Sequence, residues 1–540
     1  MIDRRIGRIV AASAVSIIVL LALQFLSAAH RAELSGYPDE PSHFVTGLML
    51  REYALGGWKD AAPVPFAERY YLHYPKVAFG HWPPVYYVAQ FLWSLPFSFS
   101  ISSLLFLQAA LLALTATGLF ALADSRDGLA PAIAAAGVFL LLPATQELNS
   151  QVMSEPLLTL LSFAATWFLA RYFTQREWVD LAAFAVLAEL AALTKGSGIA
   201  LFGLPIGLAL CLRDWAFFRS RAFWLLHLFL FGILLPWQVL TWDMARNGME
   251  AAVTWEWLIQ KGGSFLVLLP LMLGWPLVAG LLGGILMLLW RSRQHDVLPL
   301  ACAVMVAGVI VFHWISPTGV EFRRLHMALP PALVLAASGL GLAARIIKPR
   351  LLGAALPFVI AGASLAAVFN YVDKVETGYR PTARWLLAET ANREQAILTS
   401  SLNFGDGILI AELAQLAPNP SLFLVRGDKL LADSDWNGAE YRLLIQDISA
   451  LRHTLDAIPI RFIVLDAFSG ETGLPHHDLI LRLIAENPDD WILRHRQPAI
   501  SPKTRRPGEI LVYERAGLPP STTVSLRIDL RRMLGRFVTR

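Results

Sequence analysis

The 540-residue chain is poor in cysteine and in charge. Its two cysteines, Cys211 and Cys302, both lie in apolar runs, which argues against a disulfide framework and against a metal site built on a cysteine cluster. Charged residues make up 16% of the chain, whereas a soluble domain carries roughly 25%. With 56% hydrophobic residues, the composition indicates a polytopic membrane protein.

The net charge is +4, but the basic residues gather neither on one face nor in one segment. They are scattered between apolar segments, which argues against a nucleic-acid partner. Their positions act instead as topology signals, because loops rich in lysine and arginine stay preferentially in the cytoplasm.

The first long apolar segment covers 9–29 and follows Arg4, Arg5 and Arg8. It is too long for the core of a signal peptide and lacks a convincing cleavage site, so we expect a retained helix with a cytoplasmic N-terminus. Ten further long apolar runs follow: 101–123, 128–142, 156–172, 178–194, 197–212, 222–242, 265–290, 297–314, 326–345 and 351–370.

Basic clusters fall at every second connection between these runs. They are Arg126; Arg171 and Arg176; Arg213, Arg219 and Arg221; Arg291 and Arg293; and Arg345, Lys348 and Arg350. The alternation predicts about eleven transmembrane helices, an odd number that leaves the last third of the chain on the outer face. The run 84–97 is shorter than the roughly 20 residues that a span requires, which predicts a juxtamembrane or re-entrant helix.

The composition changes near residue 371. Short β-branched or aromatic runs then alternate with helical patterns, which is typical of a small α/β domain. The runs are "AILTSSLNFG", "SLFLVRGDKLL", "RFIVLDAF" and "EILVYERA", and the helical patterns lie near 405–417, 447–457 and 476–487. We therefore expect a transmembrane domain over 1–370, with a large first periplasmic loop at 30–100, and a periplasmic α/β domain over 371–540. The basic, amphipathic tail fits either a segment on an anionic membrane surface or a solvated end.

The adjacent acids Asp39 and Glu40, in "SGYPDEPSHF", open the first outer loop. Carboxylates at a membrane–water boundary are costly to keep partly desolvated, so such residues are candidates for a functional site. The alternative is a local structural role, in which Asp39 caps a helix that begins at Pro41.

The other notable polar residues fall at the same expected boundary. Glu155 opens the run 156–172, Lys195 lies between 178–194 and 197–212, and Arg323 and Arg324 precede 326–345. Lys195 and the two arginines break the positive-inside pattern that the other clusters obey. Cations kept on the outer side predict an anionic ligand there, although interfacial anchoring is the alternative.

The order of several motifs resembles one enzyme superfamily. The segments "YPDEPSHF", "HWPPVYYV", "SEPLL", "LTKGSG" and "FRRLHMALPPALVLAASGL" look like those of the polyprenyl-phosphate-sugar-dependent glycosyltransferases of the C superfold. That group includes the dolichyl-phosphate-mannose protein mannosyltransferases and the lipid A aminoarabinose transferases. The resemblance covers about residues 1–370.

The resemblance implies an inverting transfer of a sugar from a polyprenyl-phosphate donor to a hydroxyl of a glycolipid, glycan or protein. The site would lie at the outer face of the bacterial inner membrane. Asp39 matches the family's general base, and Glu155 matches its second acidic position; Glu40 completes the candidate catalytic acids. Because the leaving phosphate is a stable anion, it needs cations rather than an acid, and Lys195 with Arg323 or Arg324 would supply them.

The sequence also departs from the family. Relatives often carry Lys immediately before the double proline, whereas here Trp82 stands there, and Lys76 or His81 are candidates to replace that charge. His43 stands where relatives often have Tyr. We expect no cofactor, although Glu68, His73 and His81 leave open a metal site whose spacing matches no closed set.

Two other classes of membrane protein are the alternatives. A secondary transporter is expected to show internal repeats and interrupted helices at the membrane midplane, and the sequence shows no repeat. A polysaccharide ligase or polymerase would use a diphosphate donor and place its large loop late in the chain. Here the large loop comes early and carries the acids.

Overall fold

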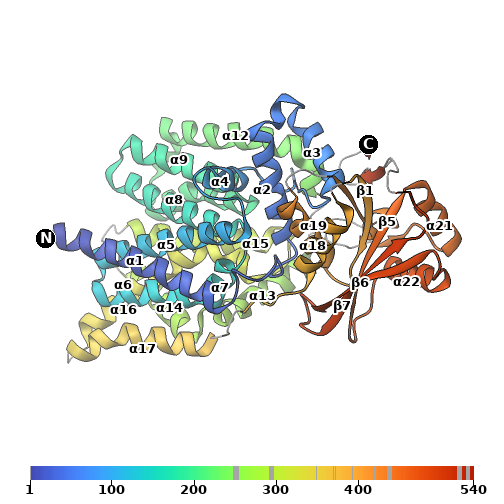
Figure 1. The fold of residues 1–540 in the computed structure, drawn as a ribbon. Coiled ribbons are helices and arrows are strands. Elements are labelled where there is room, and N and C mark those ends of the chain that lie inside the picture. Colours follow the sequence, from blue (N-terminus) through green and yellow to red (C-terminus); the bar gives the residue numbers. More distant parts are fainter. Residues whose placement is uncertain are drawn as a thin grey trace.

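The computed structural model has two parts, a bundle of helices and an α/β domain at one end of the bundle (Figure 1). It describes residues 2–78, 80–246, 254–290, 297–347, 350–368, 370, 373–391, 393–417, 421–433, 441–519, 526–530 and 536–539. Three members of the expected basic clusters, Arg291, Arg293 and Lys348, lie outside these residues. The architecture is the one expected, a polytopic helical membrane protein with a small C-terminal sheet domain.

The bundle consists of helices that run back and forth between two faces. In chain order they are α1 (Ile2–Leu26), α5 (Ile101–Arg126), α6 (Leu129–Leu141) with α7 (Pro143–Asn149), α8 (Glu155–Gln175), α9 (Trp178–Ala192), the 3-10 helix η2 (Gly196–Gly203) with α10 (Leu204–Leu212), α12 (Arg221–Arg246), α14 (Trp275–Trp290), α15 (Val297–Ile315), α16 (Leu329–Ile346) and α17 (Arg350–Val368). The short helix α11 (Trp215–Arg219) connects α10 to α12.

Within the described residues, seven helices are long and apolar enough to cross a membrane, or up to nine segments if each of two bent helix pairs counts as one span. Two expected spans therefore rest on shorter helices. They are 178–194, formed by α9, and 197–212, formed by η2 with α10.

Side-chain contacts show which helix ends meet. Arg8 Nη1, near the start of α1, donates to Asp124 Oδ1 near the end of α5 (2.9 Å). Arg345 Nη2, near the end of α16, donates to the carbonyl of Arg126 (3.1 Å). These contacts join helix ends at the far face, away from the α/β domain (Figure 1). The opposite, domain-side ends carry the candidate site.

The expectation of one continuous span over 265–290 is wrong. The chain breaks at Gly274 between α13 (Trp255–Leu273) and α14, and the two helices are bent by 108°. Gly274 has φ +74°, a conformation that favours glycine, and a Cβ there would lie 3.0 Å from the backbone of Ser364. A sharp, closely packed corner thus replaces the expected helix interior.

Both ends of α13 lie near the domain face. Near its start, the carbonyl of Leu258 accepts from Trp314 Nε1 at the end of α15 (2.7 Å). Near its end, Met272 lines a cavity together with Val368, the last residue of α17. The apolar run therefore contributes one crossing helix, α14, while α13 lies along the domain side of the bundle.

The large loop between α1 and α5 is built from short helices. They are α2 (Glu40–Leu55), the 3-10 helix η1 (Gly57–Lys59), α3 (Pro63–His73) and α4 (Val85–Ser94). The apolar run 84–97 forms the ten-residue helix α4, which is too short to span a bilayer and packs on α2. This agrees with the expectation that the run does not span the membrane.

The α/β domain has a five-stranded sheet in the order β2-β1-β5-β7-β6. Strands β2, β1 and β5 are parallel to one another, and β7 is antiparallel to both of its neighbours, β5 and β6. Its elements are α18 (Tyr379–Thr390), β1 (Gln395–Ser400), α19 (Gly405–Leu416), β2 (Leu422–Arg426), α20 (Gly427–Leu430), β3 (Ala432–Asp433), β4 (Arg442–Leu443), α21 (Ile448–Ala457), β5 (Ile460–Phe468), α22 (Pro475–Glu486), β6 (Trp491–Ile500), β7 (Pro507–Arg515), β8 (Arg527–Leu530) and β9 (Arg536–Thr539). The four expected strand runs form β1, β2, β5 and β7, and the three expected helices form α19, α21 and α22.

Sequence reasoning missed β6 and misjudged the tail. Only two of the ten residues of the edge strand β6 are buried, and the strand contains Pro498, so it lacks the apolar pattern of an interior strand. In the tail, β8 and β9 pair antiparallel, and Ile528 and Val538 are buried. Because this hairpin packs against α20 and α3, neither a membrane-surface segment nor a solvated end describes it.

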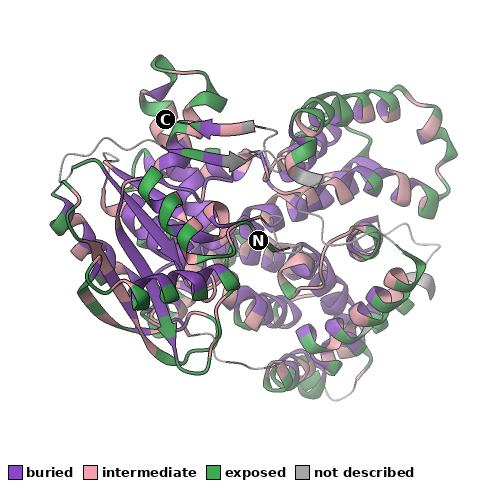
Figure 2. Ribbon diagram, turned by 90° about the vertical axis from the view of Figure 1, so that its right-hand side faces the viewer, coloured by how far each residue is buried: buried purple, intermediate pink, exposed green. Residues whose placement is uncertain are grey.

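The loop helices and the domain share one hydrophobic core. Phe44 of α2 and Tyr70 of α3 belong to the same buried cluster as Ile408 and Leu409 of α19. Figure 2 shows this buried interior continuing from the sheet into the adjoining helices. The 3-10 helix η3 (Phe322–Ala328) precedes α16 on this side of the bundle and brings Arg323 beneath the loop.

Candidate active site

Asp39 stands at the N-cap position of α2, but its side chain makes no capping hydrogen bond. Arg323 Nη1 from η3 donates to Asp39 Oδ2 instead (2.9 Å). The Asp39 side chain is 24% exposed, so its carboxylate is both paired and accessible. The helix-capping interpretation of this residue is therefore wrong.

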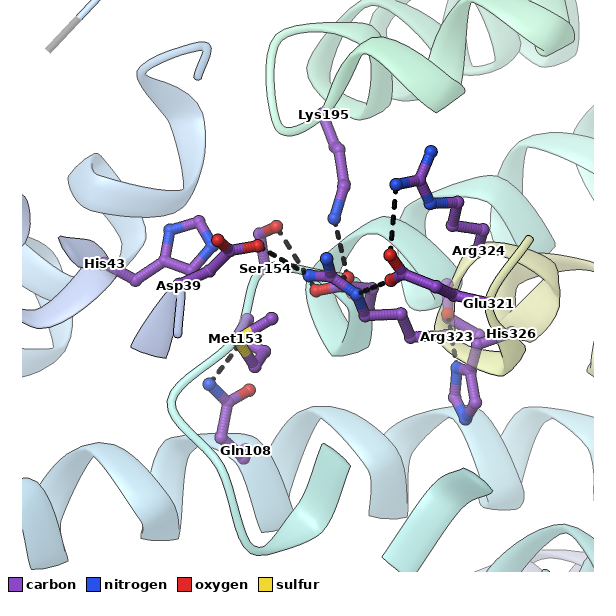
Figure 3. A network of polar contacts seen from close by, with 12 residues as sticks. Asp39, His43, Gln108, Met153, Ser154, Lys195, Glu321, Arg323, Arg324 and His326 are labelled. Carbon is purple, nitrogen blue, oxygen red and sulfur yellow. Dashed lines mark hydrogen bonds and ion pairs between the residues drawn. The ribbon is translucent and has the colours of Figure 1, made fainter. Parts of the chain in front are cut away.

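Arg323 is the centre of the polar network in Figure 3, which links three carboxylates from separate parts of the chain. Besides Asp39, it contacts Glu155 Oε1 (3.4 Å) and, through Nε, Glu321 Oε2 (2.5 Å). The guanidinium also lies 4.0 Å from the centre of the Tyr37 ring, a cation–π arrangement. The planar, multi-donor guanidinium suits such bridging, which a lysine could not reproduce.

Lys195 and Glu155 form the second strong pair. Glu155 is the first residue of α8, Lys195 follows α9, and Lys195 Nζ donates to Glu155 Oε1 at 2.6 Å. Burial lowers the pKa of Lys195, the Glu155 carboxylate opposes that shift, and the Arg323 cation adds to it. The cations that break the expected topology pattern are thus half-buried and paired with carboxylates.

A cavity of about 530 Å³ opens on this cluster. It brings together the sequence-predicted residues Asp39, Lys195, Arg323, Arg324 and His81. Its aromatic wall includes Trp82 and Trp237, and its polar wall includes Ser197, Gln238 and Thr318. Glu155 is not among the lining residues; it lies behind Lys195 and Arg323 with 2% of its side chain exposed.

Glu40 lies outside this cavity. Its side chain is fully buried and pairs with Lys374 Nζ (2.9 Å). It also accepts hydrogen bonds from the backbone N–H groups of Gly36 and Val152, both at 2.9 Å. Glu40 therefore ties the loop to the chain between α17 and the α/β domain, whereas its neighbour Asp39 faces the cavity.

The three candidate loop residues have three different environments. His81 lines the cavity. His43 is fully buried beneath Trp82, with ring centres 4.3 Å apart, and burial lowers its pKa to about 3. Lys76 lies against α19, where a Cβ on Gly407 would come within 2.4 Å of its side chain, and burial lowers its pKa.

The structure places the histidines of the possible metal site in the loop against different elements. His73 Nδ1 contacts the carbonyl of Leu422 in β2 (2.9 Å), whereas His81 Nδ1 contacts that of Met244 at the end of α12 (3.4 Å). Within the described residues, no group of three or more histidine, cysteine or acidic side chains has the arrangement of a metal site.

Sequence reasoning missed Glu321 and Tyr37, which both line the cavity. Burial raises the pKa of Glu321, but the adjacent Arg323 and Arg324 cations outweigh it and hold the pKa at about 2. Burial raises the pKa of Tyr37 to about 12. The signal for Glu321 was its position two residues before an arginine pair in "GVEFRR"; nothing local distinguished Tyr37.

These features define a polytopic membrane protein with a charged cavity at the end of its helices nearest the α/β domain. The chain resembles solved structures of ArnT from Cupriavidus metallidurans. The ArnT structure bound to undecaprenyl phosphate has a TM-score of 0.53 at 15% identity and covers 94% of this chain and 98% of that chain. The apo ArnT structure has a TM-score of 0.56 at 15% identity and covers 92% and 97%.

The chain is also similar to the archaeal oligosaccharyltransferase AglB from Archaeoglobus fulgidus, solved with an inhibitory peptide and a dolichol-phosphate. The TM-score is 0.53 at 10% identity, and the match covers 85% of this chain and 69% of that chain. No family model matches this chain, and neither does any curated protein sequence. At these identities the likenesses establish the fold.

Proposed function

We propose that this protein is an inverting glycosyltransferase that moves a hexosyl or pentosyl group from a polyprenyl-phosphate donor to a hydroxyl acceptor. The observation that carries the proposal is the convergence of Asp39, Lys195 and Arg323 on one cavity. Such a site offers a proton acceptor beside paired cations, which is what displacement of a phosphate at an anomeric carbon requires. Solved structures with the same fold contain undecaprenyl phosphate or a dolichol-phosphate, which supports a lipid-phosphate donor.

In the proposed reaction, Asp39 takes the proton of the acceptor hydroxyl as that oxygen forms a bond to the anomeric carbon. The bond from that carbon to the phosphate oxygen breaks, and its electron pair leaves with the polyprenyl phosphate. Lys195, Arg323 and Arg324 stabilise the charge that grows on this oxygen. Attack opposite the leaving group inverts the anomeric configuration.

Glu155 and Glu40 act in this scheme as positioning residues. Glu155 holds Lys195 and Arg323 from behind the cavity wall, so it fixes both cations without reaching the substrate. Glu40 fixes the start of α2, and thereby Asp39, through Lys374 and two backbone donors. The electrostatic work rests on protein cations, and activity in the presence of a chelator measures whether a divalent metal is also needed.

We place the cavity and the α/β domain on the periplasmic side of a bacterial inner membrane, because the described basic helix ends lie at the opposite face. A reporter that is active only in the periplasm, fused after Arg540, tests this orientation. We expect an active fusion. An inactive fusion, with a cytoplasmic reporter active at the same position, would overturn the placement.

Mass spectrometry of cell-envelope glycolipids and glycans tests the activity itself. Cells without the gene are expected to lack one sugar substituent that reappears with the wild-type gene and not with Asp39→Asn. Identical profiles, together with purified protein that binds no polyprenyl phosphate, would overturn the proposed function.

A further inference from the structure

Glu321 holds both arginines of the cavity at once. Its Oε2 accepts from Arg323 Nε (2.5 Å), and its Oε1 accepts from Arg324 Nη2 (3.2 Å). One anion shared between two guanidiniums is also the geometry in which arginines bind phosphate groups. The carboxylate of Glu321 thus occupies donor groups that a phosphate would use.

The charges of the cluster are balanced. Three cations, Lys195, Arg323 and Arg324, face three carboxylates, Asp39, Glu155 and Glu321. An anionic phosphate that enters a neutral cluster gains little attraction unless one carboxylate moves away. A sugar-phosphate diester carries one negative charge, so the departure of one carboxylate restores the balance.

Glu321 is the carboxylate best placed to move. Its side chain is 27% exposed, whereas that of Glu155 is 2% exposed and is held by both Lys195 and Arg323. Asp39 is needed where it is as the proposed base. Glu321 has extended backbone, with φ −139° and ψ 145°, just before η3, and lines the cavity beside Thr318.

We propose that Glu321 is a built-in competitor of the lipid phosphate. It occupies Arg323 and Arg324 when the cavity is empty, gives way when the donor phosphate binds, and returns when the product phosphate leaves. This inference rests on the proposed function and adds a mechanism of product release. The need for it follows from the chemistry: the product is a phosphate monoester with up to two negative charges at neutral pH, so the cations would otherwise hold it more strongly than the donor.

The test measures binding of undecaprenyl phosphate to purified full-length protein, together with steady-state kinetics. In Glu321→Gln we expect about tenfold tighter binding, the lower end of the effect of one charge-assisted contact. The KM for the donor and the inhibition constant of the product fall with it, and kcat falls because release is slower. Glu321→Asp keeps the charge and should retain an affinity close to that of the wild type.

Asp490→Asn is the matched control for global charge. Asp490 pairs with Arg452 on the exposed surface of the α/β domain, so its loss removes one negative charge far from the cavity. We expect unchanged affinity in this variant.

A change of affinity in the opposite direction would identify a merely structural role of Glu321. If Glu321 only held the arginines in place, Glu321→Gln would weaken undecaprenyl phosphate binding and raise the donor KM. Unchanged or weaker binding in a well-folded Glu321→Gln sample therefore overturns the inference and leaves the proposed function intact. Absence of binding to the wild type and to both Glu321 variants overturns the proposed function, and the inference with it.

Discussion

Two clusters of paired charges meet at the start of α2 and differ in what surrounds their acids. The cavity cluster consists of Asp39, Glu155, Glu321, Lys195, Arg323 and Arg324. The linker cluster consists of Glu33, Glu40, Lys374, Arg380 and Glu412 and joins the first loop to the chain that enters the α/β domain. Asp39 belongs to the cavity cluster, and Glu40, the next residue in the sequence, belongs to the linker cluster.

In the linker cluster, backbone donors add to the side-chain cations Lys374 and Arg380. Glu40 accepts from two backbone N–H groups, and Glu33 accepts from those of Thr377, Gly378 and Arg380 at 2.7–3.2 Å. Both acids are buried, Glu40 completely. A carboxylate fixed in this way cannot change partners without breaking the local fold.

The cavity cluster is held by side-chain cations. Asp39 and Glu321 are both paired with Arg323 and both remain about a quarter exposed. Side chains can exchange partners at low cost when one face of the pair is open to a cavity. Under the proposed function, burial alone does not distinguish Asp39 from Glu40; the kind of partner and the access to a cavity do.

The largest expected effect separates the two adjacent acids. Asp39→Asn removes the proton acceptor with almost no change of shape, so the transfer rate should fall roughly 10²–10⁴-fold while thermal stability stays close to that of the wild type. Asp60→Asn, on the exposed part of the same loop, is the control. A turnover assay with donor and acceptor measures the transfer rate. A rate within a few-fold of wild type would show that Asp39 takes no part in the chemistry.

Glu40→Gln should have the reverse effects, a large loss of thermal stability and a small loss of transfer rate. It leaves Lys374 buried without its partner, and breaking a buried pair in this way costs about 3–5 kcal/mol of stability. We expect a large fall in Tm but substantial turnover per folded molecule. The double variant Glu40→Gln, Lys374→Met should recover part of the Tm, because it leaves no unpaired charge. Normal Tm with lost turnover would instead move Glu40 into the catalytic set.

This contrast also measures what the sequence could predict. The order of membrane-length runs, the α/β domain and the gathering of Asp39, Lys195 and Arg323 at one end of the helices follow from hydropathy and from the positions of the charged residues. The different environments of Asp39 and Glu40 could not be predicted, because they depend on Lys374 and Arg323, which lie hundreds of residues away in the chain. The break at Gly274 was missed because hydropathy does not register a corner between two apolar helices.

Lys195→Met should weaken binding of both the polyprenyl-phosphate sugar and free polyprenyl phosphate. Loss of one charge-assisted contact costs about 1.5–3 kcal/mol, or roughly 10- to 150-fold in affinity. Lys195→Arg should restore the affinity only in part, since a guanidinium differs from an ammonium in shape and hydration. Lys59→Met in the exposed part of the loop is the control. Calorimetric titration of a well-folded sample decides, and native-like affinity would make Lys195 an interfacial anchor.

The smallest expected effect concerns another buried acid, Asp466, whose hydrogen-bond donors are neutral. Asp466 of β5 accepts from the hydroxyl of Tyr379 (2.5 Å) and from the backbone N–H of Leu402 (2.7 Å). Burial raises the pKa of Asp466 to about 7, and the nearby acids Asp406 and Glu471 add to the shift. The buried Asp466 carboxylate is thus disfavoured in its charged form.

The sign of the pH dependence follows from this shift. An unfolded aspartate has a pKa of about 3.9, so the folded state binds the proton more tightly, and the stability from Asp466 is complete below pH 3.9 and is lost as the pH rises to about 7. We expect the Tm of the wild type to fall by a few degrees between pH 5 and pH 8 relative to Asp466→Asn, whose amide does not titrate. Parallel Tm profiles for the two proteins would show that Asp466 is ionised throughout and that neutral donors alone suffice to hold a buried carboxylate.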